Sequence, residues 1–271
     1  MNTSSFECFL VVNKGLMPVT IHGYIGSARR FTKKVEANPT IEQATEYINQ
    51  MYQSKYSYHY KLNTALGVEK YMEFMGNPVK FGRQRRPKSM VKNTLTEAEI
   101  TKLIFSCKNI KEKAIISLLA YSGIRNKELC NLRVRDFDAG TNKIQILKGK
   151  GLKDGISNIS PECTNILLEY IYQNKKLQDE YLFTTYQGNQ YTGFALRKLV
   201  KVVSKRTGIL KRIFPHLFRH SLAVNLLARG ANVVLLQRQL RHSLLETTLV
   251  YINSIVFSDR SDYQKFAPSY I

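Results

Sequence analysis

Apolar residues between residues 20 and 76 recur every three or four positions, which is the spacing that places them on one face of an α-helix. The pattern is broken by Asn-Pro at 38–39 and ends at Gly-Asn-Pro at 76–78, and both are strong helix-terminating signals. A capping box of Thr40 and Gln43 predicts a helix start after the first break. We therefore expect three helices, over about 21–31, 41–51 and 58–75.

The stretch PVKFGRQRRPKSMVKN, residues 78–93, is basic, contains proline and glycine, and shows no apolar period. Such composition is typical of a linker between domains. The sequence therefore predicts a helical domain over residues 1–79, a basic linker over 80–93 and a second domain over 94–271.

The second domain is predicted to be mostly helical with one β-hairpin. Residues 142–160 alternate apolar and polar residues around a glycine-rich centre, which is the pattern of a hairpin. A capping box of Thr96 and Glu99, and Ser160 followed by Pro161, predict two helix starts. The fold class is therefore expected to be mainly α with a small β-sheet (α+β). The expected helices cover about 97–107, 111–121, 161–171, 193–207, 215–229 and 232–241.

Charge is the first unusual property of the composition. The chain holds 41 Lys and Arg against 20 Asp and Glu, which gives a formal net charge of +21, and both the first 88 residues and the rest are cationic. A field of this sign attracts polyanions, of which nucleic acid is the commonest. A ribosomal protein or a merely lysine-rich surface would have the same charge, so charge alone leaves the partner open.

The cysteines and the apolar segments favour a soluble protein of the cytoplasm. The four cysteines are far apart and form no C-x-x-C pair, which argues against a zinc site or a disulfide framework. The N-terminus lacks the charged region of a signal peptide, and the longest apolar run, 114–121, is too short to span a bilayer. We expect no metal, no membrane association and a DNA-associated location in the cytoplasm.

The most prominent local motif is His216-Leu-Phe-Arg219-His220. On a helix these three residues lie at i, i+3 and i+4, so two imidazoles and a guanidinium share one face without a neighbouring carboxylate. A face of this kind suits a phosphate. Alone it is weak, because a solvated surface of a helix can have the same residues.

Three further motifs accompany it. Arg125 follows a Ser-Gly turn and has Glu128 one helical turn later. Lys150 lies between glycines at the centre of the predicted hairpin. His242 is followed nine residues later by Tyr251.

With these residues in order, the sequence resembles the tyrosine recombinase (phage integrase) family, most closely its compact Xer-like members. The family pattern is Arg, Lys, His-x-x-Arg, His or Trp, and Tyr, and the resemblance extends over nearly the whole chain. It implies a helical, SAM-like core-binding domain that binds DNA, followed by a catalytic domain. The matching positions are Arg125, Lys150, His216, Arg219, His242 and Tyr251.

The resemblance also implies a role for each residue type. Arg125 and Arg219 would hold the phosphate, and Tyr251 would attack it to form a 3′-phosphotyrosine bond. Lys150 would protonate the leaving 5′-oxygen, and His216 would act as an acid or base in the reverse and ligation steps. His242 would donate a hydrogen bond to the phosphate. No cofactor, ATP or metal would be needed.

Supporting residues and rivals follow from the same motifs. Glu128 is expected to orient Arg125, and His220 is either a structural partner or a catalytic one. The rivals of the nucleophile are Tyr263 and Tyr270, and those of the general acid are Lys148 and Lys153. The chain departs from the family in having Phe218 where leucine is usual and Arg241 where glycine often precedes the second histidine; Arg241 would add a phosphate contact or alter packing beside His242.

Double-stranded DNA with a specific recombination site is the expected partner. Self-association on DNA is expected as well, with a dimer on each site and a tetramer in the synapse, joined through the apolar C-terminal tail, residues 252–271. Packing of this tail on its own domain is the alternative. The basic residues predicted to contact DNA are Arg29, Arg30, Lys33, Lys34, Arg83, Arg85, Arg86, Lys198, Lys201 and Arg241.

Site-specific recombination by such an enzyme would serve either dimer resolution, as in Xer proteins, or integration and excision of a mobile element. Two other functions share part of this pattern. A type IB topoisomerase shares the chemistry but relaxes supercoils. A helix-turn-helix regulator fits the two predicted helices in 225–242 but leaves Arg125, Lys150 and Tyr251 unexplained.

Overall fold

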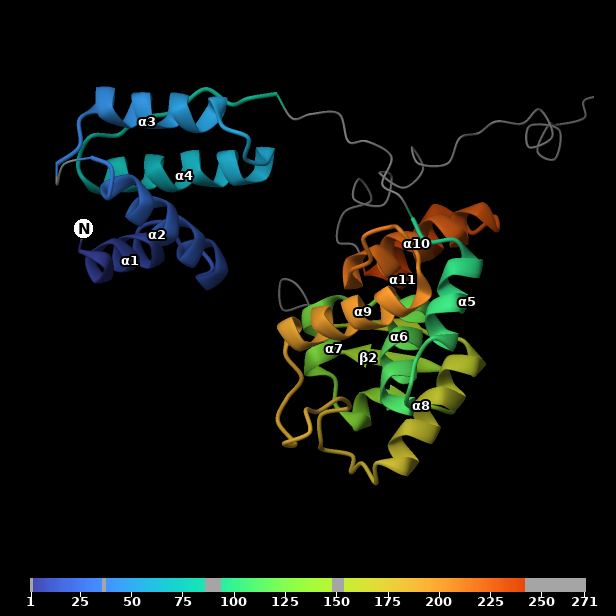
Figure 1. Cartoon of the computed structure of the whole chain (residues 1–271). Coiled ribbons are helices and arrows are strands. Elements are labelled where there is room, and N and C mark those ends of the chain that lie inside the picture. Colours follow the sequence, from blue (N-terminus) through green and yellow to red (C-terminus); the bar gives the residue numbers. More distant parts are fainter. Residues whose placement is uncertain (1, 36–37, 86–93, 148–153, 242–271) are drawn as a thin grey trace, which may run out of the picture. The chain divides into compact units, whose positions relative to one another are not determined.

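The computed structural model of the chain describes residues 2–35, 38–85, 94–147 and 154–241 (Figure 1). The chain divides into two units, Met1–Met90 and Val91–Ile271, which are described separately. Within the described ranges, no helix is both long and apolar enough to cross a membrane. The predicted class, mainly helical with a small antiparallel sheet, is confirmed.

The first unit is a bundle of helices in which α2 and α4 form the centre. Gly67 of α4 allows their close approach, because a Cβ at this position would lie 2.6 Å from the Cβ of Ser27 on α2. The core is closed by aromatic rings, among them Phe6, Phe31 and Tyr71. The three helices predicted from the apolar spacing are confirmed. They are α2 (Pro18–Thr32), α3 (Ile41–Gln53) and α4 (Tyr58–Phe74).

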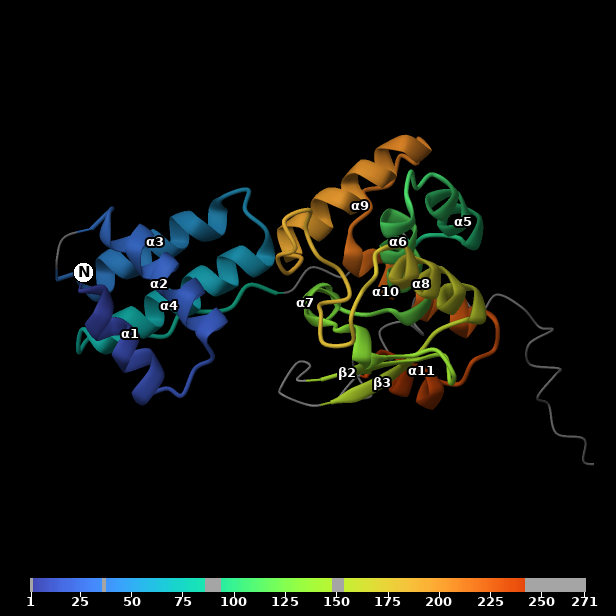
Figure 2. The ribbon, with the colours of Figure 1, turned by 90° about the horizontal axis from the view of Figure 1, so that it is seen from below.

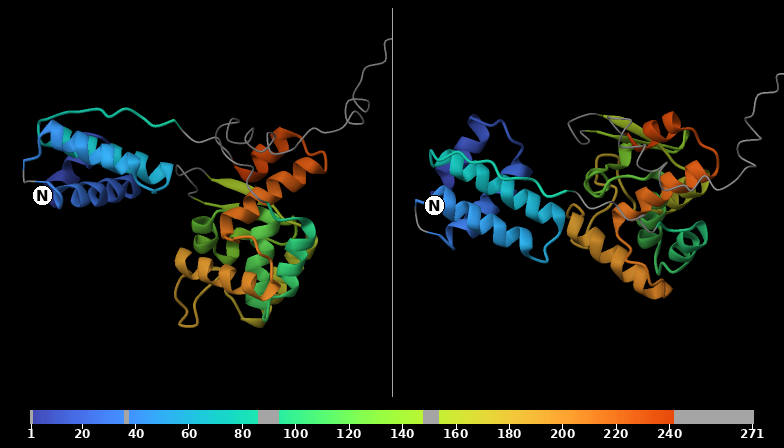
Figure 3. Two further views of the ribbon diagram at one scale, coloured as in Figure 1. Left: turned by 45° about the horizontal axis from the view of Figure 1, so that its top comes forward. Right: turned by 90° about the horizontal axis from the view of Figure 1, so that it is seen from above.

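An additional helix, α1 (Thr3–Val12), was not predicted. Asn2 caps it by accepting a hydrogen bond from the Ser5 amide at 3.2 Å. Its buried residues are Phe6 and Leu10, one turn apart, and this pair is too short a pattern to distinguish a helix from an isolated apolar patch. Figure 3 shows α3 and α4 running along each other within this unit.

Part of the predicted linker is held on α4. The nearly buried carboxylate of Glu69 accepts a hydrogen bond from the Phe81 amide at 2.7 Å and pairs with the Arg83 guanidinium at 2.7 Å. Tyr52 donates its hydroxyl to the Gly82 carbonyl at 2.8 Å. Residues 81–83 therefore pack on the first unit, while residues 86–93 lie outside the described residues.

Helix α6 (Ile110–Ser122) is the centre of the second unit. Every side chain from Ala114 to Ala120 is buried, on all sides of the helix, which explains why this part of its sequence is almost wholly apolar. Figure 2 shows α6 between helices on one side and the sheet on the other. The other helices are α5 (Glu97–Phe105), α7 (Asn126–Asn131), α8 (Pro161–Gln173), α9 (Gly193–Thr207), α10 (Pro215–Ala228) and α11 (Val233–Leu240).

The sheet contains the predicted hairpin and one short strand more. β2 (Lys143–Ile146) pairs antiparallel with β3 (Gly155–Asn158), with Ile144 opposite Ser157. β1 (Phe137–Asp138) pairs with the outer edge of β2 and was not predicted, because two residues carry no alternation. The residues that join β2 to β3, 148–153, lie outside the described residues.

Local capping signals explain why the helices of the second unit begin where the sequence predicts. Thr96 and Glu99 form the capping box of α5, and Ser160 caps α8 by accepting from the Cys163 amide at 3.3 Å. Helix α11 packs on both α10 and β3. The residue that follows it, Arg241, lies beside Arg125 at the beginning of α7. The C-terminal residues 242–271 lie outside the described residues.

Candidate functional site

Arg125, one of the two predicted phosphate-binding arginines, lies directly after a turn that the sequence marks with glycine. Gly123 ends α6 in the left-handed conformation, with φ of 62°, and the chain then turns into α7 with Arg125 at its N-cap. A Cβ at Gly123 would lie 2.9 Å from a methyl of Leu240 and would meet the Leu222 side chain as well. Glycine therefore permits both the backbone conformation and the close contact with α10 and α11.

Arg219, from the first half of α10, is 1% exposed. Its Nη1 donates to the carbonyl of Gly123 at 2.6 Å, and its Nη2 donates to the carbonyl of Leu240. A guanidinium is costly to bury unless its donors are used, and here it joins the turn after α6 to the end of α11. Arg219 therefore fixes the positions of two segments that are far apart in the sequence.

Arg125 lies beside the same two segments. Its Nη1 pairs with Glu128 Oε1 at 2.6 Å, and its Nη2 is 3.5 Å from the carbonyl of Arg241. Arg125 and Arg219 therefore donate to consecutive carbonyls, those of residues 241 and 240. The structure brings together these two arginines, which lie 94 positions apart in the sequence.

Glu128 is the carboxylate of this cluster and is nearly buried. Its Oε2 accepts from the Arg125 amide at 2.9 Å and pairs with Arg241 Nη2 at 2.8 Å. Burial by itself raises the pKa of the Glu128 carboxyl, but the charge of Arg241 and the hydrogen bonds from Arg125 outweigh it, so the pKa is lowered. One carboxylate thus faces two guanidinium groups, and with Arg219 nearby the site retains an excess of positive charge that suits an anion.

The two histidines of the motif lie next to each other on α10. The rings of His216 and His220 are 5.2 Å apart, centroid to centroid, and nearly perpendicular. His216 is exposed and His220 is partly buried, whereas Arg219 between them is buried. The helix therefore presents the imidazoles nearer to solvent than the guanidinium, although the three residues were predicted to share one face.

A buried residue that sequence reasoning missed, Gln239, joins β3 to the turn after α6. Its Nε2 donates to Ser157 Oγ at 3.0 Å and to the Asn158 carbonyl at 2.8 Å, while its Oε1 accepts from the Asn158 amide at 3.1 Å. Ser157 Oγ in turn donates to the carbonyl of Ser122 at 2.8 Å. The available signal was a polar residue between the apolar positions 236 and 240 of α11, which is too common to single it out.

Several predicted residues lie outside the described residues, and their roles stay predictions. These are Lys150 with its rivals Lys148 and Lys153, the second histidine His242, the nucleophile Tyr251 with its rivals Tyr263 and Tyr270, and the basic residue Arg86.

The basic residues predicted to contact DNA on the first unit are exposed near the end of α2. Arg29 donates to Thr3 Oγ1 at 3.5 Å, and the Arg30 guanidinium lies 5.3 Å from the centre of the Tyr60 ring. Lys33 and Lys34 follow directly after α2.

The other basic residues predicted to contact DNA differ in their surroundings. Arg83 pairs with Glu69, and Arg85 is exposed. Lys198 and Lys201 are exposed on one side of α9. Arg241 is nearly buried and pairs with Glu128, so its contact in this structure is with protein.

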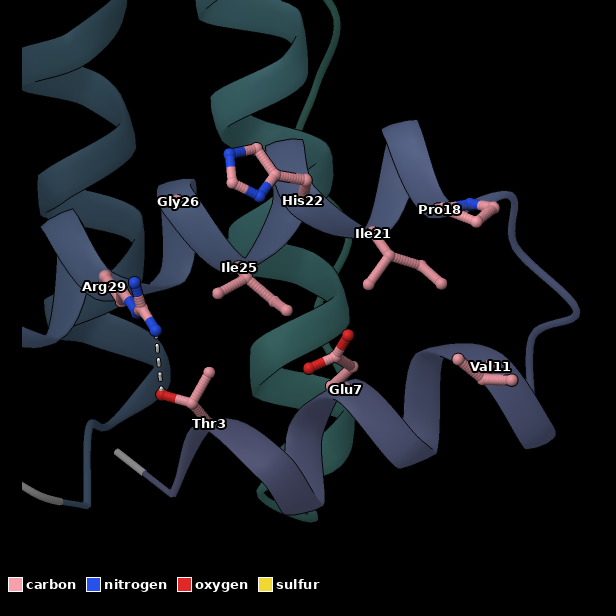
Figure 4. Close-up of a pocket in the computed structure, with 9 residues that line it drawn as sticks. All are labelled: Thr3, Glu7, Val11, Pro18, Ile21, His22, Ile25, Gly26 and Arg29. Atoms are coloured by element: carbon pink, nitrogen blue, oxygen red, sulfur yellow. Dashed lines mark hydrogen bonds between the residues drawn. The ribbon is translucent and has the colours of Figure 1, made fainter.

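A hollow of about 360 Å³ lies between α1 and α2 of the first unit (Figure 4). Ile21 and Ile25 of α2 face Glu7 and Val11 of α1 across it, and the hydrogen bond from Arg29 to Thr3 closes one end. The lining is mixed apolar and polar and does not contain a residue of the phosphate-binding pattern. Among the described residues, no group of three or more His, Cys, Asp or Glu is placed to hold a metal ion.

The sequence of the chain is similar to that of known proteins of one family. The sequence model of the phage integrase family matches residues 93–256. A tyrosine recombinase from Pseudothermotoga lettingae is 31% identical over 272 residues, covering 98% of this chain and 87% of that protein. Tyrosine recombinase XerA from Pyrococcus horikoshii is 31% identical over 221 residues, covering 79% of this chain and 76% of the relative.

Solved structures show the same fold. The crystal structure of XerA recombinase superposes with a TM-score of 0.59 at 26% identity, covering 99% of this chain and 98% of that one. The XerH site-specific recombinase bound to palindromic difH substrate superposes with a TM-score of 0.73 at 20% identity, covering 98% of this chain and 84% of that one.

Proposed function

Because the chain belongs to the phage integrase family and is a tyrosine recombinase, as the order of its motifs predicted, we propose that it recombines DNA by cutting one strand at a time through Tyr251. The relatives named as tyrosine recombinases do not favour a topoisomerase or a non-catalytic regulator. The observation that carries the proposal is the cluster of Arg125, Arg219 and Glu128 at the junction of α6, α7 and α11.

The two arginines stabilise the charge that grows on the scissile phosphate. In the transition state the non-bridging oxygens gain negative charge, and donors already held in place by protein contacts need no reorganisation at that moment. Arg125 is held by Glu128 and Arg219 by two backbone carbonyls, so both are fixed before DNA arrives. The exposed His216 serves as acid or base in ligation, and His242 donates to the phosphate.

Tyr251 supplies the nucleophile and Lys150 the proton. The phenolate oxygen of Tyr251 attacks phosphorus and forms the 3′-phosphotyrosine bond while the bond from phosphorus to the 5′-oxygen breaks. Lys150 passes a proton to that 5′-oxygen, which leaves as a hydroxyl. The reverse reaction with a different 5′-hydroxyl joins the new strand, so neither ATP nor a metal ion enters the balance.

A covalent adduct that resists SDS is the direct test of this function. Incubation of the full chain with DNA that contains its recombination site, in excess EDTA, should yield protein bound covalently to the 3′ side of a break. A helix-turn-helix regulator would release all of its DNA in SDS. A strict requirement for Mg²⁺ in the cleavage step would contradict the metal-free mechanism.

Replacement of Lys150 should slow cleavage because the leaving oxygen then departs without a proton. We expect Lys150→Ala to cleave normal DNA on the order of 100-fold more slowly than wild type. DNA with sulfur at the bridging 5′ position has a leaving group that needs no proton, so this substrate should restore most of the rate. Lys148→Ala is the matched control, and rescue of that variant instead would move the role to Lys148.

Assembly on DNA is proposed to run through the C-terminal tail, residues 252–271. The tail carries Ile255, Val256, Phe257, Tyr263, Phe266 and Tyr270, apolar side chains that a partner surface would cover. Docking on a neighbouring protomer would couple cleavage to a dimer on each site and a tetramer in the synapse. Truncation after Ser254 should leave binding to one half-site nearly intact and abolish cooperative binding to paired half-sites. Unchanged cooperativity would mean that the tail packs on its own domain.

The first unit is proposed to be the helical core-binding domain and the second the catalytic domain. Exposed Arg29, Arg30, Lys33 and Lys34 on the first unit, and Lys198 and Lys201 on the second, would contact phosphates of double-stranded DNA. The biological role is dimer resolution or movement of a mobile element, in the DNA-containing cytoplasm. Mapping the bound DNA to a host chromosome or to an element decides between them.

A further inference from the structure

Arg241 occupies a backbone conformation that its residue type disfavours. It ends α11 with φ of 54° and ψ of 47°, in the left-handed region where glycine is the usual residue. Its side chain is only 11% exposed. Its Nε is buried and has no hydrogen-bond partner among the described residues. The left-handed backbone costs free energy, so specific contacts must hold Arg241 at this place.

Those contacts join Arg241 to Arg125 in two ways. Arg241 Nη2 pairs with Glu128 Oε2 at 2.8 Å, and Glu128 Oε1 pairs with Arg125 Nη1 at 2.6 Å. The carbonyl of Arg241 lies 3.5 Å from Arg125 Nη2. Arg125 Nη1 therefore contacts the Glu128 carboxylate that Arg241 holds, and Arg125 Nη2 contacts the carbonyl that Arg241 provides.

The aliphatic part of Arg241 lies across the first residue of β3. A Cβ at Gly155 would lie 2.6 Å from Cδ of Arg241 and 3.1 Å from its Cγ. The carbonyl of Gln239 also holds the side chain, because it accepts a hydrogen bond from Arg241 Nη1 at 3.2 Å. The stem of Arg241 therefore needs glycine at position 155, and the two positions form a matched pair.

We propose that Arg241 is a positioning residue for Arg125: it fixes Glu128 with its side chain and Arg125 with its carbonyl, in a space that Gly155 leaves open. This inference rests on the proposed role of Arg125 as a phosphate ligand. Arg241 itself is not assigned to the phosphate, because it is not a position of the Arg, Lys, His-x-x-Arg, His, Tyr pattern, and its Nη1 and Nη2 donate to Gln239 and Glu128.

The first test is Arg241→Gly, which keeps the left-handed backbone and the carbonyl but removes the side chain. Cleavage of saturating half-site DNA in a single turnover should slow by about 10-fold or more, because a small displacement of a group that binds the transition state is costly. The dissociation constant for the same DNA should stay within about twofold. Arg229→Ala, which removes an exposed ion pair with Glu97 on the same unit, is the control and should cleave at the wild-type rate.

Two double variants separate positioning from a direct role. In an Arg125→Lys background the lysine cannot contact both the Glu128 carboxylate and the carbonyl of residue 241. Adding Arg241→Gly should therefore cause little further loss of cleavage rate. Gly155→Ala should displace the stem of Arg241 and slow cleavage, but should have no further effect when Arg241→Gly is already present. Gly140→Ala, in the turn between β1 and β2, is the glycine control, since its Cβ would meet Asp138 at an ordinary 3.4 Å.

The outcomes are distinct. Additive losses in Arg125→Lys with Arg241→Gly would mean that Arg241 binds DNA directly, and a wild-type rate in Arg241→Gly would mean that the residue only fills space; either result overturns the inference while wild type still forms its adduct. Failure of the wild-type protein to form any SDS-resistant adduct would overturn the proposed function and this inference with it.

Discussion

Tyr251→Phe is expected to bind its DNA site with wild-type affinity and to form no covalent adduct. The substitution removes one oxygen, which is the atom proposed to attack phosphorus, and leaves the ring for packing. On a nicked substrate that traps the intermediate, wild type should accumulate the SDS-resistant complex, and the variant should give none. The loss should be complete, because phenylalanine has no oxygen with which to form the bond.

Tyr263→Phe and Tyr270→Phe are the matched controls for this experiment. They remove the same oxygen farther along the same segment and should form the adduct as wild type does. An adduct in Tyr251→Phe, together with its absence in one of these two variants, would move the nucleophile to that residue. Equal binding by all three variants shows that the comparison concerns chemistry and not folding.

Arg219→Ala should lose both activity and stability. Removal of a preorganised donor from the site should slow cleavage by more than about 100-fold. It also leaves the carbonyls of Gly123 and Leu240 buried without this partner, at a cost of about 1–3 kcal/mol for each group. The free energy of unfolding is therefore expected to fall by roughly 2–5 kcal/mol, which denaturant titration measures.

Arg219→Lys separates the two effects. The lysine keeps the charge but provides a single ammonium in place of the planar fork, so it cannot reach both carbonyls as the guanidinium does. Cleavage should stay low at a temperature at which circular dichroism shows the variant folded. Wild-type stability in Arg219→Ala would contradict the assignment of this side chain as the connection between α6 and α11.

Local signals in the sequence predicted most of the secondary structure. Capping residues and apolar periods gave the boundaries of α3, α5, α8 and α9 to within a few positions, because both effects act between residues that are neighbours in the chain. The missed elements are α1, α7, the 3-10 helix Val134–Asp136 and β1. The last three have only six, three and two residues and show no period, and α1 buries only Phe6 and Leu10.

The order Arg125, Lys150, His216-x-x-Arg219, His242, Tyr251 was sufficient to identify the family, since chemistry restricts residue type more tightly than packing does. The burial of Arg219 could not be predicted, because Gly123 and Leu240 lie 96 and 21 residues away and their carbonyls carry no signal in the sequence. For the same reason Arg241 was predicted to contact phosphate or to alter packing beside His242.

What the sequence by itself determined is the set of helices, the hairpin and the list of reactive groups, each a consequence of short-range spacing or of residue chemistry. Only the tertiary structure decided how Arg125, Glu128 and Arg241 share their charges, and that Gly155 makes room for the third of them. These relations depend on α7, α11 and β3 meeting in space. A contact between residues more than 80 positions apart is fixed by the packing of whole elements, which the local pattern around each residue does not contain.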